Sequence, residues 1–227
     1  MAGTRAVRRE VRGDGAATRR RILLAAARVF AEKGYDRATG REIAMRARSN
    51  SAAVNYHFGG IEALYTEVLI EAHRRLLTFD RLRAVANVQG DARARLAGII
   101  GLLAETALAP PRASWAMRVL GRELMSPSPC LPAMIERELL PKKRIVTGLV
   151  GEILGLDPDD PLVAATCLDI VAPFLLLLLG DRTMLAHVFP QLRDRKIEPA
   201  VLARQLQAFA LGGIEAAERL RAARRAS

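Results

Sequence analysis

The sequence predicts an all-α protein, with an N-terminal three-helix domain that contains a helix-turn-helix and a larger helical domain after it. The composition is 51% hydrophobic but only 4% aromatic, and the apolar residues recur at the spacing of one helix face. No stretch of useful length alternates apolar and polar residues as a half-buried strand does. A chain of 227 residues can hold one large domain, or a small and a medium domain.

The chain begins with an arginine-rich segment, residues 1–17, that has no apolar face and is predicted to be a mobile basic arm. Such an arm can lie along DNA once a duplex is bound, or it can be a solvated tail. The first helix is predicted to run from Thr18, a favourable N-cap residue, to Lys33. Its buried stripe is formed by Ile22, Leu23, Ala26, Val29 and Phe30.

Residues 39–60 have the pattern of two short helices joined by a tight turn. Thr39 and Glu42 are three apart, as in a capping box, where a hydroxyl accepts from the first turn and a carboxylate reaches back. Asn50 or Ser51 can cap the second helix. Two helices of this length make a helix-turn-helix, whose second helix fits the major groove of DNA.

The second helix of this motif is predicted to have one apolar and one polar side. Val54 and Phe58 are four apart and point into the core together, and Gly59-Gly60 ends the helix. Two ordinary packing helices would show the same spacing, but the polar side carries small, amide, phenol and imidazole groups, which suit base edges and phosphates. These groups belong to Ala52, Ala53, Asn55, Tyr56 and His57.

Positive charge is concentrated at the N-terminal end. Residues 1–60 contain 13 Lys or Arg against 5 Asp or Glu, a net charge of +8, whereas the other 167 residues contain 22 against 19, a net charge of +3. A basic module on a nearly neutral body is typical of polyanion binding, although a basic surface can also serve solubility or meet a membrane. Arg19, Arg20 and Arg21 lie in the predicted first turn, where a DNA phosphate would offset their unfavourable interaction with the helix dipole.

A fourth helix is predicted as one rigid rod from Ile61 to Arg83, because Leu64, Val68 and Ala72 repeat every four residues along one side. Proline-containing breaks and a predicted loop at 85–90 separate the helices that follow. These helices are predicted at residues 91–108, 112–125, 131–154, 160–179 and 199–221, with a short helix near 183–188.

The sequence favours a cytoplasmic protein with no secretory signal, no membrane span and no enzymatic activity. Residues 162–179 form the longest apolar run, but Asp169 and Pro173 interrupt it, which favours a buried helix or a subunit interface. Cys130 and Cys167 are predicted to be buried free thiols. No spacing of His, Cys or carboxylates suggests a metal, and no motif suggests a cofactor or a catalytic nucleophile.

Three segments, ILLAAARVFAEKGYDRAT, REIAMRA and AAVNYHFGGIEALY, follow one another between Thr18 and Tyr65. In sequence and spacing they resemble the DNA-binding domain of the TetR family of bacterial transcriptional regulators, which implies a helix-turn-helix domain at 18–60. Arg48-Ser49 departs from the family's Gly-Val turn, and Ile61 replaces a lysine, which removes one expected phosphate contact. A non-Gly residue in a left-handed turn costs about 1 kcal/mol, and Arg48 can gain a phosphate contact in return.

The resemblance also implies which residues contact DNA. Those at the start of the first motif helix lie near a phosphate strand, and those on the second lie near base edges and phosphates. The implied set is Thr39, Arg41, Arg48, Asn50, Ser51, Ala52, Ala53, Asn55, Tyr56 and His57.

The segments SPSPCLPAMIERELLPKK and EILGLDPDDPLV, followed by a long apolar helix, resemble the C-terminal domain of the CecR-like TetR subgroup. This subgroup is associated with export of antibiotics and other foreign compounds, and the resemblance implies an effector-binding and dimerisation domain at 61–227. Helices 160–179 and 199–221 are predicted to pair with a second copy as a four-helix bundle. An effector cavity, or an ordinary core, is predicted from Leu102, Leu103, Trp115, Met117, Arg118, Arg122, Met125, Met134 and Phe174, with Glu105 and Asp169 as polar groups.

The sequence therefore predicts a homodimeric repressor that binds a near-palindromic DNA operator and is released by a small, largely apolar effector. The alternative is a non-specific basic nucleic-acid-binding protein without a ligand switch. A regulator should prefer one site by about a thousandfold or more. A non-specific binder should bind any duplex equally, with a steep dependence on salt.

Overall fold

The computed structural model describes residues 3–108, 115–179, 187–193 and 198–226, and within these ranges it contains helices and no strand. The predicted all-α fold is therefore confirmed. The chain forms two compact units. Unit 1 comprises Met1–Arg75 and Ala113–Arg137, and unit 2 comprises Leu76–Arg112 and Glu138–Ser227. The predicted functional division at residue 60 stays a prediction.

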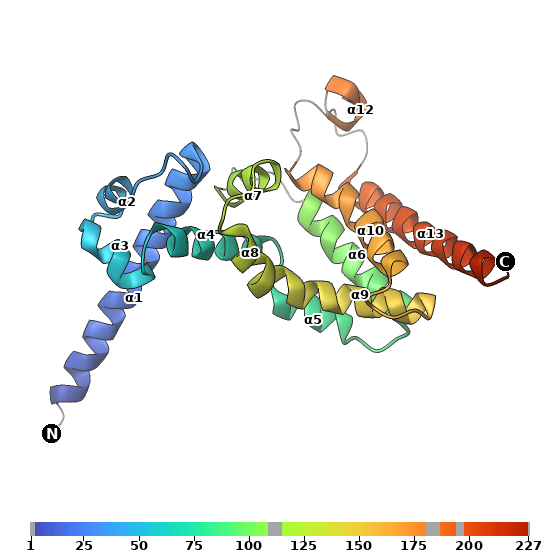
Figure 1. The fold of residues 1–227 in the computed structure, drawn as a ribbon, viewed down its shortest axis with the longest axis horizontal. Helices are drawn as coiled ribbons and strands as arrows, with labels where there is room; N and C mark the ends of the chain where they lie inside the picture. The colour runs from blue at the N-terminus through green and yellow to red at the C-terminus, as the bar shows by residue number, and fades with distance from the viewer. Residues whose placement is uncertain (1–2, 109–114, 180–186, 194–197, 227) are drawn as a thin grey trace. The chain divides into compact units, whose positions relative to one another are not determined.

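Unit 1 is built around α1, which packs against α2 and α7, while α2 packs against α3 (Figure 1). Its core contains large side chains that are almost fully buried, among them Ile22, Phe30, Ile43, Leu64 and Leu69. The helices of this unit are α1 (Gly3–Lys33), α2 (Gly40–Arg46), α3 (Ser51–Phe58), α4 (Ile61–Leu76), α7 (Trp115–Met125), α8 (Leu131–Met134) and, at its end, the π-helix η1 (Ile135–Leu139).

Helix α1 begins at Gly3 and not at Thr18, so most of the segment predicted to be a mobile arm is helical. No proline interrupts residues 3–17, and their arginine, alanine and glutamate residues are good helix formers. Thr18 lies inside the helix, where its hydroxyl accepts from Arg21 at 3.1 Å. The signal for a cap at Thr18 was therefore wrong.

The predicted rod from Ile61 to Arg83 is also wrong, because α4 ends at Leu76 and a new helix, α5 (Phe79–Ala86), begins after it. Thr78 is the reason for the break. Its backbone is extended, and its hydroxyl accepts from the Arg81 N–H at 3.2 Å, so it caps the next helix. The apolar repeat of the predicted rod ends at Leu76, since the next position of the series is Asp80.

The helix predicted at 131–154 is interrupted by one π-helical turn, η1, before it continues as α9 (Leu140–Leu154). Pro141 stands in the first turn of α9, where a proline needs no hydrogen-bond donor. The wider turn before it accommodates the proline ring without ending the helix. Glu138 and Lys142 form an almost fully buried ion pair at this junction, with a distance of 3.0 Å.

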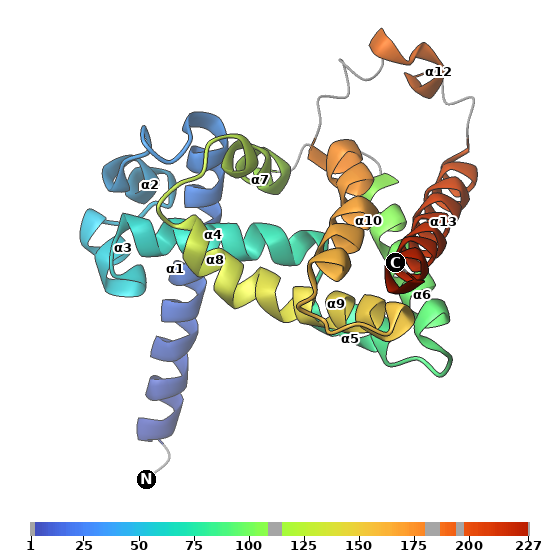
Figure 2. The ribbon, with the colours of Figure 1, turned by 45° about the vertical axis from the view of Figure 1, so that its right-hand side comes forward.

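Unit 2 is a bundle in which α6 packs against α5, α9, α10 and α13 (Figures 1 and 2). The core combines residues from all five of these helices, including Leu82, Ile99, Val150, Ile170 and Ile214. The predicted short helix near 183–188 lies mostly outside the described residues. The helices of this unit not yet given are α6 (Ala92–Leu108), α10 (Pro161–Leu179), α12 (Pro190–Arg193) and α13 (Pro199–Ala226).

Helix α10 is unusually apolar for its position. Residues Pro161–Leu178 have a mean hydropathy of 2.2. By length and composition alone this segment could cross a membrane, and 22% of it is buried within the structure. Core helices of soluble proteins have the same composition. Leu168 and Leu176 on this helix are 64% and 51% exposed, so its apolar surface is only partly covered within the chain.

Two glycines of α9 give a matched test of the packing in unit 2. A Cβ on Gly151 would lie 2.9 Å from the Leu156 carbonyl oxygen, whereas a Cβ on Gly148 would meet nothing within 4 Å. Gly151→Ala should therefore destabilise the protein by about 1–3 kcal/mol. Gly148→Ala should stabilise it by about 0.5–1 kcal/mol, because alanine favours a helix interior over glycine. Chemical denaturation measures both, and equal stabilities would contradict this packing.

Candidate DNA-binding face

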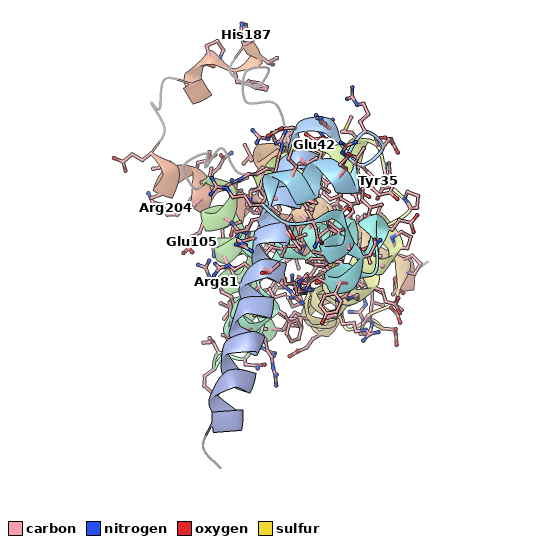
Figure 3. The ribbon with its side chains drawn as sticks, turned by 90° about the vertical axis from the view of Figure 1, so that its left-hand side faces the viewer. Tyr35, Glu42, Arg81, Glu105, His187 and Arg204 are labelled. Atoms are coloured by element: carbon pink, nitrogen blue, oxygen red, sulfur yellow. The ribbon has the colours of Figure 1, made fainter. Side chains whose placement is uncertain are left out.

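The first helix of the motif, α2, begins at a side-chain cap. Thr39 is extended, and its hydroxyl oxygen accepts from the Glu42 N–H at 3.3 Å, which satisfies one N–H of the first turn. The Glu42 carboxylate accepts from Lys33 at 2.7 Å and from Arg46 at 2.9 Å (Figure 3). One half of the predicted capping box is confirmed, and ion pairs engage the carboxylate that was expected to complete the other half.

Ion pairs between the end of α1 and α2 hold these two helices together. Arg46 also pairs with Glu32 of α1 at 2.7 Å, so two residues at the end of α1 hold two residues of α2. The hydrogen bond from Lys33 lowers the pKa of the Glu42 carboxyl below its ordinary value. The stabilisation from this carboxylate is therefore present at neutral pH and is lost as the pH falls through the lowered pKa.

The second helix, α3, begins at the first of its two candidate caps. The Asn50 side-chain oxygen accepts from the Ala53 N–H at 2.8 Å. The helix ends at Gly59, which is left-handed with φ 80°, as predicted for a glycine cap. Val54 is 3% exposed and anchors the inner side of the helix. Local sequence signals therefore define both ends of α3 and its buried side.

The turn between α2 and α3 contains a strained residue. Among the described residues, Arg48 is the one residue other than glycine with a positive φ, at 50°. Its N–H donates to the Met45 carbonyl at 3.1 Å, and the Ser49 N–H donates to the Ala44 carbonyl at 2.9 Å, so the turn is well bonded. Strain retained at one position of a functional turn suggests that the side chain has a use there.

Replacing Arg48 with glycine tests this idea. Because glycine adopts positive φ without steric cost, Arg48→Gly should stabilise the fold by about 1 kcal/mol or less. If the guanidinium contacts a phosphate, the same change should weaken DNA binding and reduce the slope of log K against log salt by about 0.9 for each bound subunit. Denaturation and binding titrations measure the two effects, with Arg48→Lys as the control that keeps charge and strain. A loss of stability in Arg48→Gly would contradict the strain.

The outer side of α3 is open. Tyr56 is 85% exposed, and its ring meets the His57 ring edge-on at 5.0 Å. Two residues of the implied DNA-contacting set also serve the fold, since the Thr39 hydroxyl and the Asn50 oxygen hold helix caps. Of the full set, Thr39, Arg41, Arg48, Asn50, Ser51, Ala52, Asn55 and Tyr56 are exposed, and Ala53 and His57 are half-buried.

A buried carboxylate joins α4 to the segment 113–137. Glu123 is 3% exposed, and its carboxylate accepts from the Tyr65 hydroxyl and from both the N–H and the hydroxyl of Ser128, each at 2.8 Å. Burial and the nearby Glu123 raise the pKa of Tyr65 far above its ordinary value, so the phenol remains a donor. Sequence reasoning placed residues 113–137 in the effector domain, because no local pattern reveals a partner 58 residues away.

The residues predicted to line an effector cavity divide between the two units. In unit 2, Phe174 belongs to the bundle core and Leu102 is buried on α6. Glu105 of the same helix pairs with Arg81 at 3.0 Å (Figure 3). In unit 1, Trp115 lies under the Arg75 guanidinium, with 4.9 Å to the ring centroid, and Arg122 donates to a backbone carbonyl of α1. Of the other predicted pocket residues, Leu103 and Asp169 are in unit 2, and Met117, Arg118, Met125 and Met134 are in unit 1.

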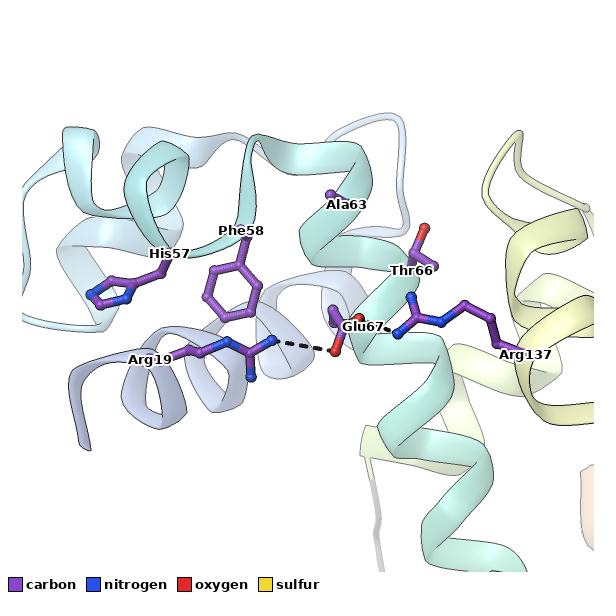
Figure 4. A pocket seen from close by; sticks show the side chains of 7 residues that line it. All are labelled: Arg19, His57, Phe58, Ala63, Thr66, Glu67 and Arg137. Atoms are coloured by element: carbon purple, nitrogen blue, oxygen red, sulfur yellow. Dashed lines mark hydrogen bonds and ion pairs between the residues drawn. The ribbon is translucent and has the colours of Figure 1, made fainter. Parts of the chain in front are cut away.

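A cavity of about 230 Å³ opens beside the end of α3 (Figure 4). Charged and apolar groups both face it. None of the predicted effector-pocket residues is among those that line it, so sequence reasoning missed this site. The available signal was the run of three arginines, Arg19 to Arg21, on α1. The lining residues are Arg19, His57, Phe58, Ala63, Thr66, Glu67 and Arg137.

The remaining reactive groups are the two thiols and the potential metal ligands. Cys130 is buried and Cys167 half-buried, both as free thiols, and burial raises the pKa of Cys167 to about 11. In the part of the chain that the structure describes, no group of three His, Cys, Asp or Glu residues could hold a metal ion.

A capped two-helix motif with an open polar side, on a basic N-terminal unit, defines a helix-turn-helix DNA-binding protein. Residues 22–68 match the profile of the bacterial regulatory proteins of the tetR family. Residues 92–214, more than half of the chain, match that of the C-terminal domain of the HTH-type transcriptional dual regulator CecR. The chain therefore belongs to the TetR family of transcriptional regulators, with a CecR-like C-terminal domain, and is a regulator and not an enzyme.

The chain is also similar to individual proteins. The chain is 33% identical over 100 residues to the HTH-type transcriptional repressor Rv1474c of Mycobacterium tuberculosis, a match that spans 44% of this chain and 46% of that protein. Its fold is similar to that of FadR from Bacillus subtilis in complex with stearoyl-CoA, with a TM-score of 0.60 at 18% identity over 85% of this chain and 97% of that one. A regulator from Pseudomonas aeruginosa PAO1 gives a TM-score of 0.65 at 17% identity, over 88% and 92% of the two chains.

Proposed function

We propose that the protein is a homodimeric repressor that binds a near-palindromic operator through α3 and is released by a small, largely apolar effector. The observation that carries the DNA-binding part is the outer side of α3, where Ser51, Asn55 and Tyr56 are exposed and the helix is fixed at both ends. Hydroxyl, amide and phenol groups held on a rigid helix suit base edges and phosphates. The relative from Mycobacterium tuberculosis is named a repressor, which favours repression over activation.

A second copy of the chain would cover the apolar residues that α10 and α13 leave exposed. Leu168 and Leu176 of α10 and Phe209 and Leu220 of α13 are each more than half exposed. These helices pack against each other, and two such pairs related by a twofold axis form a four-helix bundle. A dimer would also present two copies of α3 to the two half-sites of an operator.

Phe209→Arg should therefore weaken the proposed dimer by at least about tenfold, because a charge would be buried between the copies. Phe209 is 68% exposed within the chain, so the substitution leaves the folded chain itself unstrained. Sedimentation velocity across a concentration series measures the effect. Val88→Arg, at another exposed apolar position of unit 2, is the matched control. Equal self-association of both variants and the unchanged protein would contradict the α10–α13 interface.

The effector is proposed from the apolar character of unit 2, whose core combines leucine, isoleucine, valine and phenylalanine side chains. The FadR structure contains stearoyl-CoA. At 18% identity this likeness supports a common fold, and the ligand of the present chain has to be identified by experiment. Acyl-CoA molecules and hydrophobic drugs are suitable probes. A true effector should release the protein from its DNA at concentrations that leave a non-specific duplex complex unchanged.

Selection of DNA by the full chain from random duplexes tests the proposed function. A site-specific regulator, acting on chromosomal DNA in the cytoplasm, should enrich one near-palindromic sequence and prefer it by about a thousandfold or more. Equal affinity for all duplexes, with a steep salt dependence, would instead favour the non-specific basic binder.

A further inference from the structure

The carboxylate of Glu67, on α4, lines the cavity beside the end of α3 and is shared by two arginines from distant parts of unit 1. Arg19 of α1 pairs with one oxygen of Glu67 on α4 at 3.3 Å, and Arg137 of η1 pairs with the other oxygen at 2.8 Å (Figure 4). The Arg19 guanidinium also lies over the Phe58 ring, with 4.5 Å to the centroid. All four side chains line the cavity of about 230 Å³.

The Arg19 side of this bridge is the weaker one. Its distance to Glu67 is 3.3 Å against 2.8 Å for Arg137, while the two arginine side chains are similarly exposed, at 44% and 52%. Exposed ion pairs are weak, so a better anion can displace the carboxylate. Stacking on Phe58 fixes the plane of the guanidinium. Arg19 can therefore exchange one anionic partner for another with little movement.

The cavity lies where the phosphate backbone of a bound duplex would supply such an anion. His57, which belongs to the implied DNA-contacting set, lines the same cavity and lies one residue before the end of α3. A duplex bound along α3 brings its phosphate backbone to the edge of this helix. Phosphate accepts the paired hydrogen bonds of a guanidinium as a carboxylate does, and it carries the same sign of charge.

We propose that Arg19 is a ligand of a DNA phosphate and that Glu67 competes with this phosphate for the Arg19 guanidinium. Arg137 holds the carboxylate from its other side and so leaves Arg19 more available. This inference rests on the proposed function. It assigns Glu67 and Arg137 to the control of DNA affinity, although neither needs to touch DNA.

Three charge-removing substitutions test the competition. Glu67→Gln should raise the affinity for the selected duplex by about twofold to fivefold, because Arg19 is released to the phosphate. Arg19→Gln should lower the affinity and reduce the slope of log K against log salt by about 0.9 for each bound subunit. Arg137→Gln should lower the affinity while Glu67 is present and have no effect in the Glu67→Gln background, which a double-mutant cycle measures.

Glu71→Gln is the matched control, because Glu71 lies one turn further along α4 and also pairs with an arginine, Arg75, at 3.0 Å. It should leave the affinity unchanged. If Glu67→Gln lowers the affinity together with the melting temperature, or raises it equally when Arg19→Gln is also present, Glu67 has a structural or a general electrostatic role and the proposal is overturned.

The measurements separate this inference from the proposed function. Failure of the unchanged protein to select any duplex overturns the proposed operator, and the salt slope of Arg19→Gln on an unselected duplex still decides whether Arg19 contacts phosphate. Normal selection by the unchanged protein, with an unaltered salt slope in Arg19→Gln, overturns the inference about Arg19 alone.

Discussion

Tyr56→Ala and Asn55→Ala are each expected to abolish operator binding at protein concentrations that saturate the unchanged chain. Both side chains are exposed on α3, and Tyr56 is 85% exposed, so their loss removes groups that face outward. A good contact to a base edge is worth about 1–3 kcal/mol. In the proposed homodimer the contact is lost twice, which doubles the loss of binding free energy. Fluorescence anisotropy with the selected duplex measures the loss.

The control for this prediction is that both variants keep the fold and the self-association of the unchanged protein. Since neither side chain caps a helix or fills the core, circular dichroism, melting temperature and self-association should stay those of the unchanged protein. Val88→Ala, which removes an exposed apolar side chain from unit 2, should leave both fold and DNA binding intact. Normal operator binding by Tyr56→Ala and Asn55→Ala would show that α3 does not read the DNA.

The sequence predicted the helix-turn-helix well because its signals are local. Thr39 and Asn50 cap the helices that directly follow them, and Gly59 ends α3 in the left-handed conformation that favours glycine. The same kind of signal was overlooked at Thr78, although the apolar repeat of the preceding helix ends at Leu76. It was also misread at Thr18, which lies inside α1.

Contacts between distant segments were beyond the reach of sequence patterns. Glu67 receives Arg19 from 48 residues before it and Arg137 from 70 residues after it. Nothing in the spacing of these residues distinguishes them from other charged side chains on helix surfaces. The division of the predicted effector-pocket residues between two units has the same origin, since the periodicity of each helix gives its buried side but not its neighbour.

Loss of Glu123 is expected to cause the largest loss of stability. Its carboxylate is the common acceptor for the Tyr65 hydroxyl and for two donors of Ser128, in a site where Glu123 and Tyr65 are each 3% exposed. Glu123→Ala leaves three donors without this acceptor and opens a small cavity in unit 1. The buried Tyr65 hydroxyl without its acceptor costs about 1–3 kcal/mol, and the lost bonds of the half-buried Ser128 and the lost packing add to this, so a total loss of about 3–5 kcal/mol is expected from chemical denaturation.

A graded series separates the hydrogen bonds from the packing. Tyr65→Phe removes one donor and keeps the ring beside Phe30 and Tyr35, so it should cost only about 1–2 kcal/mol. The two changes should not be additive, because the Tyr65 donor has already lost its acceptor in Glu123→Ala. A loss below about 1 kcal/mol in Glu123→Ala would contradict the buried network. If the network does hold residues 113–137 on α4, the same variant should also release the α7–α8 segment to proteolysis before the rest of unit 1 unfolds, since local opening exposes first the segment that has lost its buried contacts.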